Sequence, residues 1–148
     1  MKLIDFSPQH ENAFYHMCRE FFSSPAVCHP ISTEAMKTTF QTACSHSPYM
    51  RGLMITKNDE IIGYLLLSFT YSNEVGGMVV WIEELFITEE HRGKGYGKKV
   101  LQWVMVTYSH QAKRFRLEVT EENTLAKKLY QSMGFSNLPY EQMTLESF

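Results

Sequence analysis

The sequence predicts a mixed α/β domain, and three observations lead to that fold class. Two segments of β type, Leu53 to Thr56 and Ile61 to Phe69, flank a turn at Asn58-Asp59 and predict a hairpin. A long apolar run from Met78 to Thr88 predicts another strand. Segments with helical spacing of apolar residues precede and follow these strands. At 148 residues the chain suits a single domain with one core, which we expect to span residues 1–148.

The N-terminal part predicts one strand followed by two helices. Leu3 to Phe6 has the pattern of a short strand, and Ser7-Pro8 is a typical helix start. The helix that follows carries apolar residues on one face, namely Phe14, Met17, Cys18 and Phe21. Ser24-Pro25 to Pro30 predicts a break, and a second helix begins after Ser32, a favourable N-cap residue.

The C-terminal part predicts two more helices and three more strands. We expect a helix from Gly95 to His110, a strand from Phe115 to Val119, and a helix from Asn123 to Met133 that Gly134 ends. Phe135 and Met143 to Leu145 predict final short strands. The expected order is therefore β-α-α-β-β-β-α-β-α-β-β, with helices flanking a sheet.

The composition argues against several classes of function. A net charge of −2 gives no bulk attraction to nucleic acid or to an anionic membrane. No apolar run approaches the ~20 residues that a membrane-spanning helix needs, and the N-terminus lacks a secretory apolar region. The three cysteines, Cys18, Cys28 and Cys44, predict reduced thiols and a cytoplasmic location. Cys28-His29 and His46 lack any known metal-ligand spacing, so we expect no metal.

A glycine-rich basic loop, His91 to Gly97, lies between the predicted strand and the predicted helix. Its glycines let the backbone approach a ligand closely, and the helix start offers N–H groups at the positive end of the helix dipole. The spacing matches neither the P-loop nor the dinucleotide-binding fingerprint. On its own the loop fits a pyrophosphate site and a solvated basic turn about equally well.

Two ordered motifs change that balance. Arg92-x-x-Gly95-x-Gly97, which follows Glu84 to Ile87, resembles the acetyl-coenzyme A signature of the GNAT superfamily of N-acetyltransferases. A second block is similar to the family's fifth strand and the helix after it: Leu117-Glu118-Val119, then Asn123, Ala126 and Leu129-Tyr130 through Gly134-Phe135. The resemblance implies a mixed, mostly antiparallel sheet that is splayed between its fourth and fifth strands.

The resemblance also implies acetyl-coenzyme A as cosubstrate and assigns residues to it. The pyrophosphate would lie on the loop formed by Arg92, Gly93, Lys94, Gly95, Tyr96 and Gly97. The pantetheine arm would pair with the backbone at Leu85, Phe86 and Ile87, and Asn123 and Tyr130 would lie beside it. Leu85 and Ile87 also fit a plain core role, and Asn123 a simple N-cap.

The catalytic candidates are one tyrosine and three glutamates. Tyr130 matches the family tyrosine near the coenzyme sulfur, where a phenol can protonate the departing thiolate; its alternative role is core packing. Adjacent strand residues point to opposite faces, so only one of Glu83 and Glu84 would reach the acceptor pocket unless a bulge intervenes. Glu83 matches the base position of polyamine acetyltransferases, and Glu118 that of ribosomal-protein N-terminal acetyltransferases. We rank them Glu83, Glu84, Glu118.

These residues predict an N-acetyltransferase that moves an acetyl group to a primary amine by direct attack in a ternary complex. We expect a small cationic acceptor, bound between the two N-terminal helices, the Ala26 to Ile31 loop and the Tyr71 to Gly77 turn. Phe21, Phe22, His29, Tyr64, Tyr71 and Trp81 are candidate lining residues. The alternatives are a peptide N-terminal amine as acceptor and a non-catalytic acyl-coenzyme A module. The expected assembly is a monomer or homodimer.

Overall fold

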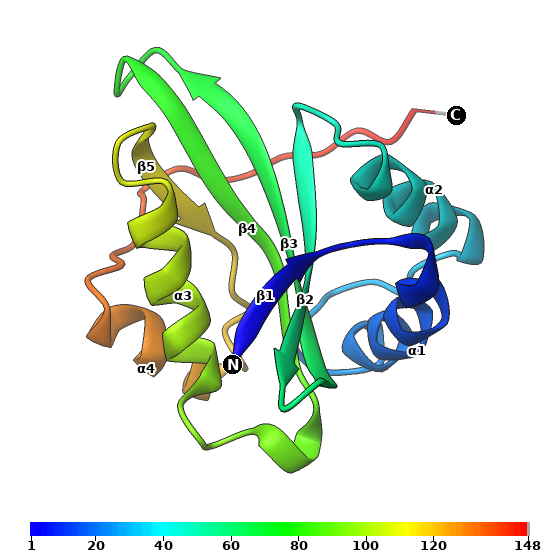
Figure 1. Cartoon of the computed structure of the whole chain (residues 1–148). Coiled ribbons are helices and arrows are strands. Elements are labelled where there is room, and N and C mark those ends of the chain that lie inside the picture. The colour runs from blue at the N-terminus through cyan, green and yellow to red at the C-terminus, as the bar shows by residue number, and fades with distance from the viewer. Residues whose placement is uncertain (148) are drawn as a thin grey trace.

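A five-stranded sheet forms the centre of the computed structural model, which describes residues 1–147 (Figure 1). Its strands lie in chain order, and each neighbouring pair is antiparallel except the last, β4 with β5, which is parallel. The strands are β1 (Lys2–Asp5), β2 (Met50–Lys57), β3 (Glu60–Ser72), β4 (Gly77–Ile87) and β5 (Ala112–Leu117). This is the mixed, mostly antiparallel sheet that the sequence predicts.

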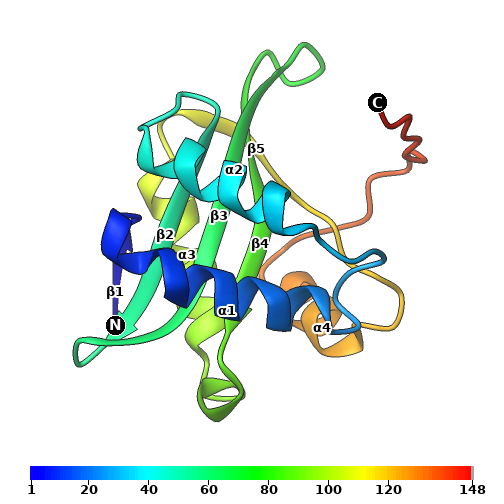
Figure 2. The same cartoon turned by 90° about the vertical axis from the view of Figure 1, so that its right-hand side faces the viewer.

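Helices cover both faces of the sheet (Figure 2). One face carries α1 (Glu11–Phe22) and α2 (Thr33–Cys44), and the other carries α3 (Tyr96–Thr107) and α4 (Thr124–Ser132). Two short 3-10 turns, Pro8–His10 and Glu89–His91, precede α1 and the glycine-rich loop. Ser32 caps α2 as expected, because its Oγ accepts a 3.0 Å hydrogen bond from the backbone N–H of Ala35.

The alternation of side chains along the strands divides the core into two layers. Tyr64 and Leu66 of β3 face α1 and α2, whereas Leu65 and Leu67 face α3. All four side chains are buried, so β3 is covered on both faces. A strand covered on both faces reads as a continuous apolar run, which is how Ile61 to Phe69 appears in the sequence.

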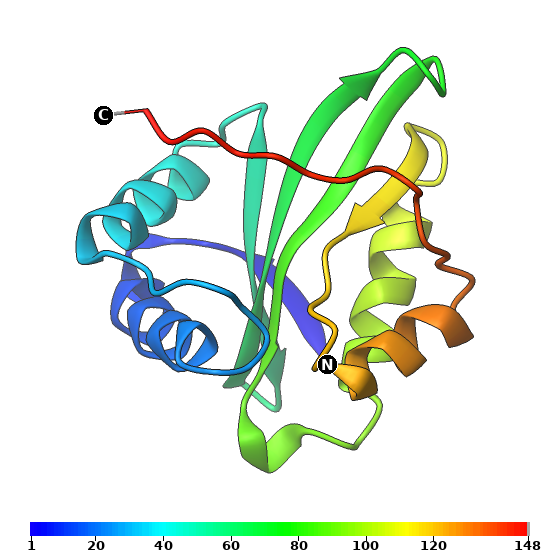
Figure 3. The same ribbon diagram turned by 180° about the vertical axis from the view of Figure 1, so that it is seen from behind.

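The last two strands separate part-way along their length (Figure 3). Parallel pairing runs from Met78 with Ala112 to Ile82 with Leu117 and ends there. Beyond this point β4 continues to Ile87, paired only with β3. The splay between the fourth and fifth strands is therefore confirmed, and it leaves one edge of β4 without a strand partner from Glu83 onward.

The C-terminal strands are the part of the predicted order that is wrong. In the described part of the C-terminal segment, residues 134–147, no strand forms. Met143 and Leu145 alternate as strand residues do, but they are 94% and 95% exposed, so no apolar surface receives them. Phe135 instead packs against the core on the α3 side. Strand β5 also ends at Leu117, which places Glu118 and Val119 beyond it.

Among the described residues, every helix is too short or too polar to cross a membrane. The same residues contain no group of three His, Cys, Asp or Glu side chains placed to hold a metal ion. Cys28 and His46 in fact line two different cavities.

Candidate active site

A β-bulge in β4 brings two carboxylates to the same face of the sheet. Leu66 of β3 pairs with Glu84, and the next residue, Leu67, pairs with Ile82, so Glu83 is an extra residue without its own partner. Ile82 and Leu85 both face the α3 core, on either side of this extra residue. Glu83 and Glu84 therefore both lie on the α1–α2 face. The expectation that adjacent residues point apart fails here because of the bulge.

The two glutamates have different surroundings. Glu84 is half-buried, and its Oε2 accepts a 2.6 Å hydrogen bond from the hydroxyl of Tyr64, a ring with no exposed surface. Burial raises the pKa of Glu84 to about 7, and the negative charge of Glu83 adds to this, while the Tyr64 hydrogen bond opposes it. Glu83 is exposed and accepts a hydrogen bond from the hydroxyl of Ser68.

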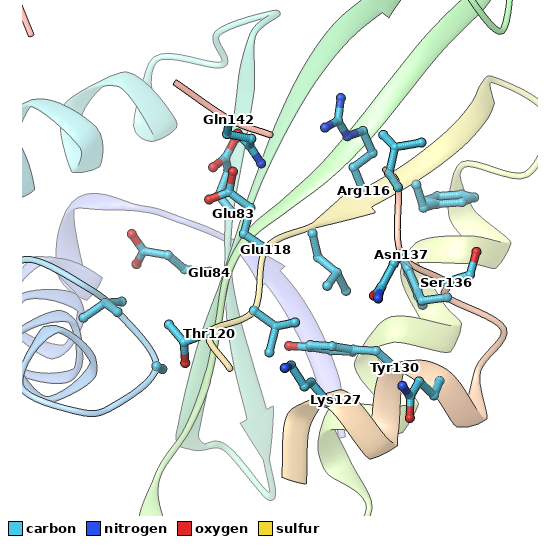
Figure 4. A pocket seen from close by; sticks show the side chains of 18 of the residues that line it. Glu83, Glu84, Arg116, Glu118, Thr120, Lys127, Tyr130, Ser136, Asn137 and Gln142 are labelled. Atoms are coloured by element: carbon cyan, nitrogen blue, oxygen red, sulfur yellow. The ribbon is translucent and has the colours of Figure 1, made fainter. Parts of the chain in front are cut away.

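Both carboxylates line a cleft of about 1530 Å³ that follows the splay (Figure 4). One wall is the end of α1 with the loop of residues 26–30, and the other is α4 with residues 136–140 and 142 of the C-terminal segment. Glu118, just beyond β5, lines the cleft together with Glu83 and Glu84, and Tyr130 reaches into it from α4. The structure thus brings together the four residues that the sequence marks as catalytic candidates.

Tyr130 and Asn123 each keep their structural role. The Tyr130 ring is half-buried and lies 6.0 Å from the ring of Phe135, and burial raises the pKa of its phenol. A tyrosine of this kind stays protonated near neutral pH, as a proton donor must. Asn123 caps α4, because its Oδ1 accepts a 3.3 Å hydrogen bond from the backbone N–H of Ala126.

The glycine-rich loop has the backbone that an anion site needs. Gly93 and Gly95 have φ angles of +70° and +79°, in the left-handed region that favours glycine. Apart from the adjoining residues of the chain, no described atom lies within 4 Å of the point where a Cβ would stand on either residue. Gly95 is also the N-cap of α3. The loop is therefore open at a helix start, which fits a pyrophosphate bound by backbone N–H groups.

Arg92 holds this loop against the end of β4. Its Nε donates a 2.8 Å hydrogen bond to the carbonyl oxygen of Ile87, and its guanidinium lies 5.3 Å from the centre of the Phe86 ring. The side chain also approaches a carboxylate oxygen of Glu20 at 3.5 Å, at an exposed position. These contacts give Arg92 a structural role beside any contact with phosphate.

Leu85, Phe86 and Ile87 fit both roles that the sequence allows. Their side chains pack into the two cores, Phe86 on the α1 side and the other two on the α3 side. The backbone edge that faces away from β3 has no strand partner in this stretch. The residues can therefore support the core while their backbone pairs with an extended ligand.

Three features of the site could not be identified from the sequence motifs. Tyr64, expected to line the acceptor pocket, is buried behind Glu84. Tyr71, on the hairpin between β3 and β4, is 74% exposed and does not line the cleft. Arg116, which the motifs do not single out, lines the cleft with its guanidinium 4.1 Å from the centre of the Trp81 ring. The bulge places Glu84 beside Tyr64, and the strand register places Arg116 beside Trp81.

Comparison with known proteins decides the family. The model of the acetyltransferase (GNAT) family matches residues 12–135. The chain belongs to the GNAT family. Relatives include the spermine/spermidine N(1)-acetyltransferase of Bacillus subtilis, 29% identical over 91 residues, which are 59% of this chain and 60% of that protein. The thialysine N-epsilon-acetyltransferase of Sus scrofa is 33% identical over 79 residues, 53% of this chain and 46% of that protein.

Solved structures share the complete fold of this GNAT chain. One is AAC(6′)-Iy in complex with a bisubstrate analog of CoA, with a TM-score of 0.79, 14% identity, and coverage of 99% of this chain and 98% of that one. Another is the "possible acetyltransferase" of Clostridium difficile 630, with a TM-score of 0.80, 16% identity, and coverage of 99% of this chain and 97% of that one. The chain spans roughly half to three-fifths of the length of the curated relatives above.

Proposed function

We propose that this GNAT chain transfers the acetyl group of acetyl-coenzyme A to the primary amine of a small molecule. The observation that carries the proposal is the β4 bulge, which directs Glu83 and Glu84 into one cleft where β4 and β5 separate. The pyrophosphate-type loop lies at the far end of the same stretch of β4. The relatives named as spermine/spermidine and thialysine acetyltransferases support an amine acceptor.

The cosubstrate supplies an activated thioester, and the chain supplies the means to hold it. Backbone N–H groups from Gly93 to Gly97 would bind the pyrophosphate at the start of α3. The unpaired edge of β4 from Leu85 to Ile87 would hold the extended arm in line with the cleft. The acetyl group then lies near the point where the strands separate, beside the carboxylates.

Glu84 is the residue that we propose as general base. An amine attacks only in its neutral form, so the protonated acceptor must lose a proton before or during attack. A pKa of about 7 lets the carboxylate accept that proton near neutral pH, whereas an ordinary glutamate is a weaker base. Burial and the Tyr64 contact distinguish Glu84 from the exposed Glu83, which the sequence ranks first.

Tyr130 is the proposed proton donor to the departing thiolate, across the cleft from the carboxylates. Attack in a ternary complex needs no protein nucleophile. Cys18 is unsuited to that role, because burial raises the pKa of its thiol to about 12. Cys28 lines the cleft and is exposed, so it provides the test of an acetyl-enzyme route.

The experiment measures thiol release from acetyl-coenzyme A with a panel of small amines and peptides, against a control without amine. We expect amine-dependent release with small amines, reduced strongly in Glu84→Gln and retained in Cys28→Ala. Acetyl-coenzyme A should also raise the Tm, because it binds only the native state. A Tm shift without turnover of any amine would favour a non-catalytic acyl-coenzyme A module. Turnover of peptides alone would favour the N-terminal acetyltransferase alternative.

A further inference from the structure

A positively charged side chain, Arg116, lines the same cleft as the carboxylates. Arg116 of β5 is half-buried, and its guanidinium lies 4.1 Å from the centre of the Trp81 ring, its direct partner across the parallel pair. Arg116 takes part in none of the ion pairs formed among residues 1–147. Arg114, two residues earlier on the same face, is instead held by Glu74 at 2.7 Å.

The register places Arg116 on the stretch of sheet that leads into the splay. Trp81 precedes Glu83 by two residues on β4, which is about 7 Å along the strand. Arg116 likewise precedes Glu118 by two residues. Glu83, Arg116 and Glu118 line the cleft, whereas Trp81 does not (Figure 4). The cleft therefore carries negative charge at the splay and the guanidinium of Arg116 one step along the sheet. Lys113, Arg114 and Lys127 also line it.

From this arrangement we infer that Arg116 binds a carboxylate on the acceptor, so the preferred substrates are diamino acids and not simple diamines or polyamines. The inference rests on the proposed function. A guanidinium stacked on an indole keeps its N–H groups fixed and free to bind a carboxylate through two hydrogen bonds. A polyamine would instead place an ammonium group next to the guanidinium, which like-charge repulsion opposes.

The test uses acceptors that differ only in the carboxylate. Ornithine is paired with putrescine and lysine with cadaverine, and kcat/KM is measured for each with saturating acetyl-coenzyme A. We expect at least one diamino acid to exceed its diamine by about tenfold to a hundredfold, the effect of a hydrogen bond to a charged group. Diamines that match or exceed their diamino acids would overturn the inference and leave the proposed function standing.

Variants then assign the preference to Arg116. In Arg116→Gln the ratio of kcat/KM between diamino acid and diamine should fall to about one, and Arg116→Lys should keep part of it because the charge remains. The double variant Arg114→Gln/Glu74→Gln removes the neighbouring ion pair without freeing a carboxylate for Arg116, and it should keep the ratio. A ratio unchanged in Arg116→Gln, or an equal loss for both substrates, would mean that Arg116 only packs against Trp81. If no amine is acetylated by the wild type, the proposed function itself fails, and this inference fails with it.

Discussion

The hydroxyl of Tyr64 donates a 2.6 Å hydrogen bond to the carboxylate of Glu84, from a ring with no exposed surface. The bond stabilises the charged form of Glu84 and so opposes the effect of burial, which favours the neutral form. The pKa of about 7 is the balance of these two influences and the charge of Glu83. Tyr64 is thus a positioning residue, which both orients the proposed base and limits the rise of its pKa.

Removing the Tyr64 hydroxyl should move the acidic limb of the pH–rate profile upward. A base works when it is deprotonated, so kcat/KM falls as pH drops below the pKa of Glu84. Tyr64→Phe removes a donor to the charged form and should raise that pKa by about one unit or more. We expect about a fivefold or larger loss of kcat/KM near pH 7 that diminishes at higher pH.

A second phenol–carboxylate pair provides the matched control. Tyr15 is also buried and donates a 2.8 Å hydrogen bond to Glu11, on the same helix and outside the cleft. Tyr15→Phe should cost similar stability without moving the pH limb. With one amine used throughout, ionisation of the substrate cancels between variants. A limb that moves equally in both variants, or in neither, would contradict the role of Tyr64.

The effects of substituting the three glutamates should depend on the burial of each carboxylate and not on the side of the strand on which it lies. Glu84→Gln should lower kcat by about a hundredfold at neutral pH, the typical contribution of a general base. Glu83→Gln and Glu118→Gln, at exposed positions, should mainly raise KM for a cationic acceptor, by severalfold. The Glu84→Gln loss should shrink as pH approaches the pKa of the amine, because free amine then needs less help. Equal losses at all three sites, independent of pH, would mean that none is a discrete base.

The sheet was predictable because its strands carry their own local signals. The turn at Asn58-Asp59 joins β2 and β3, and both of its residues adopt positive φ. The continuous apolar run of β3 and the capping residues Ser32 and Asn123 likewise indicate elements through local chemistry. The C-terminal segment shows the limit of such signals. Met143 to Leu145 has a strand-like pattern, but a strand also needs a partner edge and an apolar surface. Both must come from other parts of the chain, and here Met143 and Leu145 stay exposed.

The site was predictable where a motif fixes the backbone and unpredictable where two strands meet. The loop glycines, Tyr130 and the glutamates follow from local motifs. The bulge depends on the register between Leu66 and Glu84, which no single segment encodes. For the same reason the sequence could not show that Tyr64 supports Glu84 or that Arg116 lies on Trp81.

Gly95→Ala should separate the cost of backbone strain from the loss of cofactor binding. Alanine at a φ of +79° costs about 1 kcal/mol of stability, although no described atom would clash with the new methyl group. In the proposed pyrophosphate site the methyl group would also meet the phosphate, so affinity for acetyl-coenzyme A should fall more than about tenfold. Titration calorimetry measures the affinity, and thermal unfolding measures the stability.

Gly76→Ala is the control for that experiment. Gly76 has a φ of +63°, has equally open surroundings, and lies in the turn between β3 and β4, away from the loop. Its alanine variant should lose similar stability and keep its affinity for acetyl-coenzyme A. Equal affinity in the two variants would place the pyrophosphate somewhere other than on the glycine-rich loop.

The last prediction concerns the proton donor. Tyr130→Phe keeps the ring that packs near Phe135 and removes only the hydroxyl, so the Tm and the affinity for acetyl-coenzyme A should change little. The kcat should fall by about tenfold or more, because the thiolate then leaves without a proton. Since burial raises the pKa of Tyr130, the wild-type enzyme should show no loss of kcat from its ionisation until the pH exceeds the ordinary tyrosine range.

Tyr140→Phe is the matched control, because Tyr140 also lines the cleft but its hydroxyl is directed to Glu74 at 3.5 Å. The kcat of that variant should equal the wild-type value. Single-turnover measurements must accompany the steady-state rates, because slow product release would conceal an effect on the chemical step. If the single-turnover rate of Tyr130→Phe matches that of the wild type, the thiolate takes its proton from solvent, and Tyr130 serves only to pack the wall of the cleft.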